Sequence, residues 1–255
     1  VRGGEVDIET CELPAWQYET LVTPRTKLVA LTAASGTVGT RPDVATVAEF
    51  ARRVGALMVV DASFAAPFVP LDIHASGADV MVVSALSWGG PAVGALVFRD
   101  PGLLNRIHSV SLDQAARVPA RLEVGAHAYA LLAGMVASVD FLAGLDDTAA
   151  GSRRERLLAS IAAARHHTSE LLALLTSELR AMRHVMLIGD AMRRIPALAF
   201  TVVDHKAAEV VQYLASRGIC AFADDGTTGL FAALGVGEVG GAVRIGLAHY
   251  TSRFE

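Results

Sequence analysis

Lysine is almost absent from this chain of 255 residues. Of its 22 basic residues, only Lys27 and Lys206 are lysines, and the rest are arginines. Chemistry that requires a lysine amine therefore has only two places to find one. Cysteine is equally scarce, because Cys11 and Cys220 lie far apart without the spacing of metal ligands. This usage excludes a disulfide scaffold and suits a reducing compartment such as the cytoplasm.

Several other classes of protein are excluded by what the chain lacks. Although 53% of its residues are hydrophobic, no apolar run reaches the ~18 residues that a membrane span needs. The most apolar stretch, residues 126–145, contains His127 and Asp140, and we expect a buried helix there. The net charge of −4 and scattered arginines argue against nucleic-acid binding. No HExxH or paired-cysteine motif is present, so no metal site is expected.

The two ends of the chain bear on how complete a site could be. The chain begins without methionine, its first residues are polar, and it stops at TSRFE without a terminating pattern. Polar first residues predict no signal peptide. We expect the chain to be a piece of a longer protein, so that a site could draw residues from outside it.

Short apolar runs separated by turn residues predict an α/β fold with parallel strands buried on both faces. A strand, a helix that Thr40 could cap and that runs to about Val54, and a second strand form a βαβ unit. We expect a large domain over residues 1–150 and a smaller α/β domain over 151–255, joined by a long helix. The predicted strands cover 26–34, 56–60, 79–84, 92–98, 195–203, 219–223 and 242–250, and the predicted long helices cover 126–145 and 152–183.

Polar residues follow two of these strands at their carboxyl ends, where open parallel sheets bind ligands. Asp61 ends one strand and could hold a cationic ring nitrogen or a metal, or simply form a turn. Ser84 and Ser87 flank a glycine turn that could bind phosphate, although serines are common in turns. Arg244 lies within an apolar strand and requires an anion, which is either a ligand or a structural partner.

Four segments together resemble the class V aminotransferase family, in the cysteine-desulfurase-like branch of the fold-type I pyridoxal-phosphate enzymes. They read TKLVALTAASGTVGT, GALMVVDASFAAPFVPLDIHASGADVMVVSA, SWGGPAVGALVFRD and VRIGLAHYTS. The resemblance implies a three-layer α/β/α large domain whose first part lies outside this chain, and a smaller C-terminal α/β domain. It also implies a homodimer with sites at the subunit boundary and an amino-acid-like ligand.

Three positions match residues that carry function in that family. Asp61 matches the aspartate that pairs with the pyridinium nitrogen of the cofactor and keeps the ring an electron sink. Ser84 matches a serine that helps to bind the cofactor phosphate. Arg244 matches the arginine whose guanidinium holds the carboxylate of the substrate.

Other functional positions of the family are replaced. Ser87 stands at the position of the Schiff-base lysine, and no other residue is assigned as catalytic. Because a serine cannot form an imine, the covalent link and the proton-transferring base are both lost there. Lys27 precedes a strand and Lys206 begins a helix of the second domain, so neither is placed to substitute. The other replacements are Ala33 and Leu86 for histidines, Gly36 for an asparagine, Phe64 for a glutamine, Ala126 for the threonine after Glu123-Val124-Gly125, and Asp224-Asp225 in the segment of the desulfurase cysteine.

Three hypotheses about function follow. The first is a degenerate or divergent homologue that binds pyridoxal 5'-phosphate or a phosphorylated ligand non-covalently through Asp61 and Ser84. The second is an active transferase or lyase on an amino acid, with a base supplied from outside this chain. The third is a non-catalytic partner in a dimer with an active relative.

Overall fold

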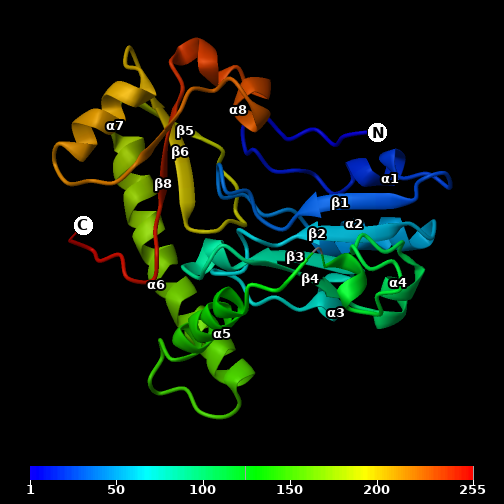
Figure 1. The fold of residues 1–255 in the computed structure, drawn as a ribbon. Coiled ribbons are helices and arrows are strands. Elements are labelled where there is room, and N and C mark those ends of the chain that lie inside the picture. Colours follow the sequence, from blue (N-terminus) through cyan, green and yellow to red (C-terminus); the bar gives the residue numbers. More distant parts are fainter. Residues whose placement is uncertain (124, 255) are drawn as a thin grey trace.

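The computed structural model describes residues 1–123 and 125–254 and contains two four-stranded sheets (Figure 1). The first sheet has the order β1-β2-β3-β4. β1, β2 and β3 pair in parallel, and β4 pairs with β3 in the antiparallel direction. The four strands are Leu28–Thr32, Leu57–Asp61, Val80–Ser84 and Gly94–Phe98. The sequence predicts all four, each within about two residues of its ends.

The second sheet has the order β5-β6-β8-β7 and only antiparallel pairs. Its strands are Val185–Ile188 (β5), Ala197–Val202 (β6), Phe222–Asp224 (β7) and Ala242–Gly246 (β8). The sequence predicts three of them and misses β5, a short segment directly after a long helix. The domain boundaries proposed from the sequence stay a prediction.

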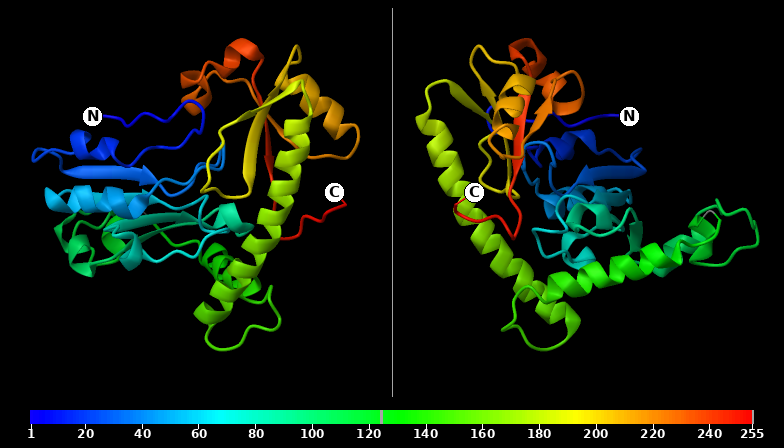
Figure 2. Two further views of the ribbon diagram at one scale, coloured as in Figure 1. Left: turned by 180° about the vertical axis from the view of Figure 1, so that it is seen from behind. Right: turned by 60° about the vertical axis from the view of Figure 1, so that its left-hand side comes forward.

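The helices place these sheets relative to one another. α6 (Arg153–Ala181) spans 29 residues, or about 44 Å, and runs from the side of α5 to the second sheet (Figure 2). Its start is fixed by a capping box in which Ser152 and Glu155 satisfy each other's backbone N–H groups. The other helices are α1 (Gln17–Leu21), α2 (Val44–Arg53), α3 (Ile73–Ser76), α4 (Pro101–Arg106), α5 (Tyr129–Ala143), α7 (Ala207–Ala215) and α8 (Gly229–Ala233), with 3-10 turns η1 (Ala85–Trp88), η2 (Ala120–Leu122) and η3 (Val236–Val239).

Each sheet has its own hydrophobic core. In the first, Val47 and Ala51 of α2 pack on Met58 and Val60 of β2, all nearly inaccessible to solvent. In the second, Leu172 and Leu179 of α6 pack with side chains of β6 and β8, namely Leu198, Phe200 and Val243. Burial of such side chains is worth about 1.5–3 kcal/mol each, which makes both cores substantial. No helix of the described residues is long and apolar enough to cross a membrane.

Three expectations about local structure are wrong. The helix expected to be buried over residues 126–145 is α5, of which only Leu142 and Ala143 are buried. β1 is not buried on both faces, because Leu28, Ala30 and Thr32 are exposed and alternate with buried residues. Thr40 does not cap α2. Asp43 does, accepting a hydrogen bond from the backbone N–H of Thr46 at 3.2 Å. Thr40 is instead buried and forms an antiparallel bridge with Arg194, a contact between distant segments that local spacing does not reveal.

This bridge belongs to a junction between the two halves of the chain. Ile195 N–H donates to the carbonyl of Gly39 at 2.8 Å. The guanidinium of Arg194 donates to the carbonyls of Val38 and Ala197 at 3.1 and 2.9 Å. Gly39 has φ of +83°, and a Cβ there would lie 2.4 Å from the carbonyl oxygen of Ala197. The junction therefore requires glycine at this position.

Candidate functional site

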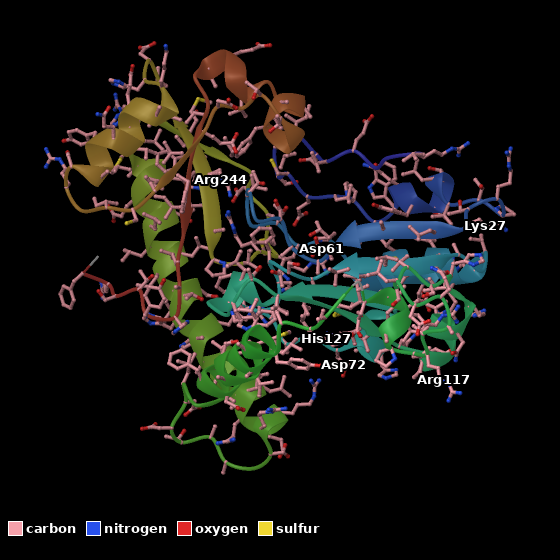
Figure 3. The ribbon with its side chains drawn as sticks, viewed as in Figure 1. Lys27, Asp61, Asp72, Arg117, His127 and Arg244 are labelled. Carbon is pink, nitrogen blue, oxygen red and sulfur yellow. The ribbon has the colours of Figure 1, made fainter. Side chains whose placement is uncertain are left out.

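The polar strand-end residues of the first sheet lie together, as parallel strands require. Asp61 closes β2 and stands opposite Thr32, the last residue of β1. Ser84 closes the neighbouring strand β3. Figure 3 places Asp61 at the edge of the sheet that faces Arg244, and Lys27 at the opposite end of β1. This edge is the candidate ligand site.

Asp61 has an exposed carboxylate whose local turn fixes its direction. One oxygen, Oδ1, accepts a hydrogen bond from the backbone N–H of Ser63 at 2.9 Å. Within residues 1–123 and 125–254, no cationic side chain forms an ion pair with Asp61. The other carboxylate oxygen is thus available to a positively charged group of a ligand.

Arg244 reaches across from the second sheet to this edge. Its Nη2 donates to the carbonyl of Gly36 at 3.3 Å, and its Nη1 lies 3.4 Å from Oδ2 of Asp224 on β7. Its Nε is buried without a hydrogen-bond partner in the described part of the chain. The structural ion pair expected as one alternative is therefore present. The side chain remains 34% exposed, which leaves room for a second anion.

Phe64 occupies space beside Gly36. A Cβ on Gly36 would lie 2.7–2.8 Å from three ring carbons of Phe64, closer than real contacts allow. The ring is 50% exposed, so it forms an apolar surface at the edge of the site. The two replacements in the family pattern at positions 36 and 64 are thus sterically linked.

We expect Gly36→Ala to displace the Phe64 ring toward solvent and to lower the free energy of unfolding by about 1 kcal/mol. In a Phe64→Ala background the same change should cost almost nothing, because no ring is left to displace. Denaturant unfolding of the wild type, both single variants and the double variant measures the coupling. If Gly36→Ala lowers the free energy of unfolding equally with and without the Phe64 ring, residue 36 does not contact that ring.

Ser84 and Ser87 belong to a turn held by α5. Ser84 directly precedes the 3-10 turn η1, and its hydroxyl makes no cap hydrogen bond. Ser87 lies within η1, where no hydrogen bond to its side chain is found among the described residues. Trp88 Nε1 donates to the hydroxyl of Ser138 on α5 at 2.9 Å. A Cβ on Gly134 would touch Pro91 at 3.3 Å. The backbone of the turn is therefore fixed by helix packing, independently of what residue 87 is.

Neither lysine lies at this edge of the sheet. Lys27 directly precedes β1 at the far end of the strand (Figure 3). Lys206 directly precedes α7 and lines an open cavity of about 600 Å³ whose walls all come from the second half of the chain, including Asp224 and Asp225. The expectation that neither is placed to replace the missing lysine stays a prediction that this geometry supports.

The sequence misses Asp224 as the partner of Arg244 and the packing of Trp88 on α5. Asp224 ends β7, which pairs with the strand that carries Arg244. An acidic residue close to the end of a predicted strand is the only feature of the sequence that could have indicated this partner. Cys220, expected within a strand, precedes β7 and is exposed. Ala126 follows Gly125, while Val124 of the expected Glu-x-Gly motif lies outside the described residues. Glu123 and His127 approach each other to 2.9 Å beside it.

The cofactor implied by the resemblance fits these residues in part. An exposed carboxylate at residue 61 and an unengaged hydroxyl at residue 84 suit a ring nitrogen and a phosphate. Ser87 provides no amine, so the residues do not fit a covalent link. The phenyl ring beside Gly36 provides no hydrogen-bond partner for a ring hydroxyl. The site thus fits non-covalent holding and not covalent attachment.

Comparison with known proteins agrees with the fold. A family model described as aminotransferase class V matches residues 8–255. A protein of Mycobacterium tuberculosis described as uncharacterized is 49% identical over 255 residues, which are 100% of this chain and 64% of that protein. A probable cysteine desulfurase of Streptomyces coelicolor is 29% identical over 213 residues, 78% of this chain and 48% of its own length.

Solved structures extend the comparison. The cysteine desulfurase CsdA of Escherichia coli superposes with a TM-score of 0.77 at 23% identity, over 94% of this chain and 59% of its own. An apo cysteine desulfurase of Thermococcus onnurineus gives 0.79 at 20% identity, over 99% of this chain and 62% of its own. The predicted α/β fold of the fold-type I enzymes is confirmed. The chain spans less than two thirds of the length of these proteins.

Proposed function

Because the chain belongs to the aminotransferase class-V family, we propose that it is a divergent member that holds pyridoxal phosphate, or a similar phosphorylated ligand, without a covalent bond. Asp61 would pair with the cationic ring nitrogen, and Ser84 would donate its hydroxyl to the phosphate. When bound, pyridoxal phosphate supplies an electron-withdrawing ring. The observation that carries the proposal is an exposed, unpaired Asp61 carboxylate on the same edge as a serine at position 87.

Arg244 would orient the ligand's amino-acid-like part. A guanidinium binds a carboxylate through two parallel N–H donors, but here one arm already faces Gly36 and the other Asp224. A ligand carboxylate would share the guanidinium with Asp224, which weakens binding relative to an unpaired arginine. With no lysine to accept a proton, the chain's own residues bind and orient and do not transfer protons.

We also propose a homodimer in the cytoplasm. α5 presents an apolar face to solvent, with Tyr129, Leu132 and Val136 on one side of the helix and 73%, 38% and 51% exposed. The C-terminal half of α5 packs on η1 and α6, and its N-terminal end extends away from them (Figure 2, right). A second copy could cover this face. Both cysteines are free thiols, which suits a reducing compartment.

Titration of the full-length protein with pyridoxal phosphate tests the proposed function. We expect saturable binding by calorimetry, with no lysine labelled after borohydride reduction and peptide mapping. Asp61→Asn should weaken binding at least about tenfold, since a charge-assisted hydrogen bond is worth about 1.5–3 kcal/mol. Asp113→Asn, an exposed aspartate far along the chain, serves as the matched control and should bind as the wild type does.

Two results would contradict this proposal. A lysine labelled by borohydride would favour the active transferase or lyase, with its base supplied from outside this chain. Absence of any binding would leave the role of a non-catalytic dimer partner.

A further inference from the structure

Two arginines stand side by side at the junction between the halves of the chain. Thr40 and Arg194 form an antiparallel bridge, and Arg41 N–H donates to the carbonyl of Arg193 at 2.9 Å. This register places Arg41 directly opposite Arg193. Like charges directly opposite each other across an antiparallel pair are destabilising. The backbone therefore holds two cations together that repel one another.

The protein neutralises only one of them. Oδ2 of Asp43 lies 3.6 Å from Nη1 of Arg193, while Oδ1 of the same aspartate caps α2. Arg41 has no acidic partner among the described residues, and its Nε is buried without a hydrogen bond. Burial, together with the nearby charges of Arg165 and Arg193, lowers the pKa of Arg41. Since a guanidinium stays protonated, this shift means that its charge is poorly compensated in this place.

Arg41 and Arg193 line a cavity of about 280 Å³ together with two carboxylates, Asp43 and Asp72. Both carboxylates are already engaged, Asp43 by Arg193 and the start of α2, and Asp72 by Arg154 and the start of α3. The floor of the cavity is apolar and is formed by Val60 of β2, Met81 of β3 and Val69 of the intervening loop. Asp61, Ser84 and Arg244 do not line this cavity, but Ala33, which replaces a histidine of the family, does. The cavity therefore borders the candidate cofactor site and shares none of its three charged or hydroxyl-bearing residues. It lies just below the range of ~300–1,000 Å³ for small-molecule sites, which limits its ligand to a small one.

We propose that this cavity binds a small organic anion, with its carboxylate or phosphate between Arg41 and Arg193 and its apolar body against Val60, Val69 and Met81. The anion would neutralise the positive charge of Arg41, which Asp43 does not neutralise because it pairs with Arg193. A guanidinium pair presents several N–H donors to such an oxyanion, and the apolar floor favours a ligand with a hydrocarbon part. The proposal does not depend on binding of pyridoxal phosphate.

Calorimetry on the full chain, in a buffer without phosphate, tests the proposal with hexanoate, acetate and inorganic phosphate as probes. We expect hexanoate or phosphate to bind and Arg41→Gln to weaken that binding at least about tenfold. Hexanoate should bind more tightly than acetate if the apolar body enters the cavity. Arg52→Gln, which removes an exposed arginine of α2 paired with Glu49, is the control and should bind as the wild type does.

Thermal unfolding gives an independent readout. Without added anion and at low salt, Arg41→Gln should unfold about 2 °C above the wild type, because the repulsion with Arg193 is gone. Saturating hexanoate or phosphate should reverse this order. If Arg41→Gln does not fold, Arg41→Lys keeps the charge, loses the planar fork and should bind a few-fold more weakly.

Three outcomes would overturn the proposal. The first is that neither hexanoate nor phosphate binds, and the second is that Arg41→Gln binds them as the wild type does. The third is that acetate, hexanoate and phosphate all bind equally tightly. The cavity would then not distinguish an apolar ligand or a phosphate from any other anion. Binding of phosphate above hexanoate would assign the ligand to the phosphate esters, and the reverse order to the carboxylates.

Discussion

We expect the variant Ser87→Lys to acquire covalently attached pyridoxal phosphate, and the wild type to acquire none if the proposed function holds. A lysine amine condenses with the cofactor aldehyde and releases water, whereas a serine hydroxyl forms no such imine. The turn that carries residue 87 is fixed by Trp88, which donates to Ser138, so the backbone does not depend on the side chain at 87. Borohydride reduction and peptide mapping should label the introduced lysine close to stoichiometrically.

A matched control is available on the surface of α6. Ser169→Lys introduces the same amine at an exposed position without a neighbouring strand end, and it should remain unlabelled at equimolar cofactor. If folded Ser87→Lys also stays unlabelled, the site no longer binds the ring and the phosphate of the cofactor. We expect no turnover from the labelled variant, since Leu86 and Phe64 provide no polar groups to the ring.

Gly39→Ala should cause the largest loss of stability, about 3–4 kcal/mol. A left-handed backbone conformation costs an L-residue about 1–2 kcal/mol. In addition, the new Cβ would lie 2.4 Å from the carbonyl oxygen of Ala197 and 3.0 Å from that of Ile195, and forcing apart packed backbone costs about 1–3 kcal/mol. Thermal unfolding should show a midpoint lower by about 10 °C.

Gly55→Ala separates these two contributions. Gly55 has a similar φ of +70°, but a Cβ there would meet nothing within 4 Å. It should therefore lose only the backbone part, about 1–2 kcal/mol. Equal destabilisation by both substitutions would show that contact with the second half of the chain adds nothing at Gly39.

Local patterns in the sequence predict most of the elements. Val-rich runs such as residues 56–60 and 79–84 become β2 and β3, and the helix predicted over 152–183 is α6. The misses have physical reasons. β5 is a short strand that exists because β6 pairs with it, and Thr40 is drawn from the helix cap into a bridge with Arg194.

Of the candidate site, the sequence predicts only the residues whose position follows from the strand that they end. The positions of Asp61 and Ser84 follow from the rule that parallel strands present their carboxyl ends at one edge. Partners from other segments do not follow. Arg244 donates to the carbonyl of Gly36 across 208 positions of the chain, and a backbone carbonyl has no sequence signature. The ring of Phe64 beside Gly36 likewise became visible only in three dimensions.

The junction around Gly39 also has a consequence for how the chain folds. The hydrogen bond from Arg194 to the carbonyl of Val38 joins residues 156 positions apart. Closing a loop of this length costs more chain entropy than forming β1 to β4 or α6, whose contacts are local. We therefore expect the junction to form late, after both cores have condensed. A late contact is absent from the transition state, so loss of the junction in Gly39→Ala should speed unfolding and leave the folding rate nearly unchanged.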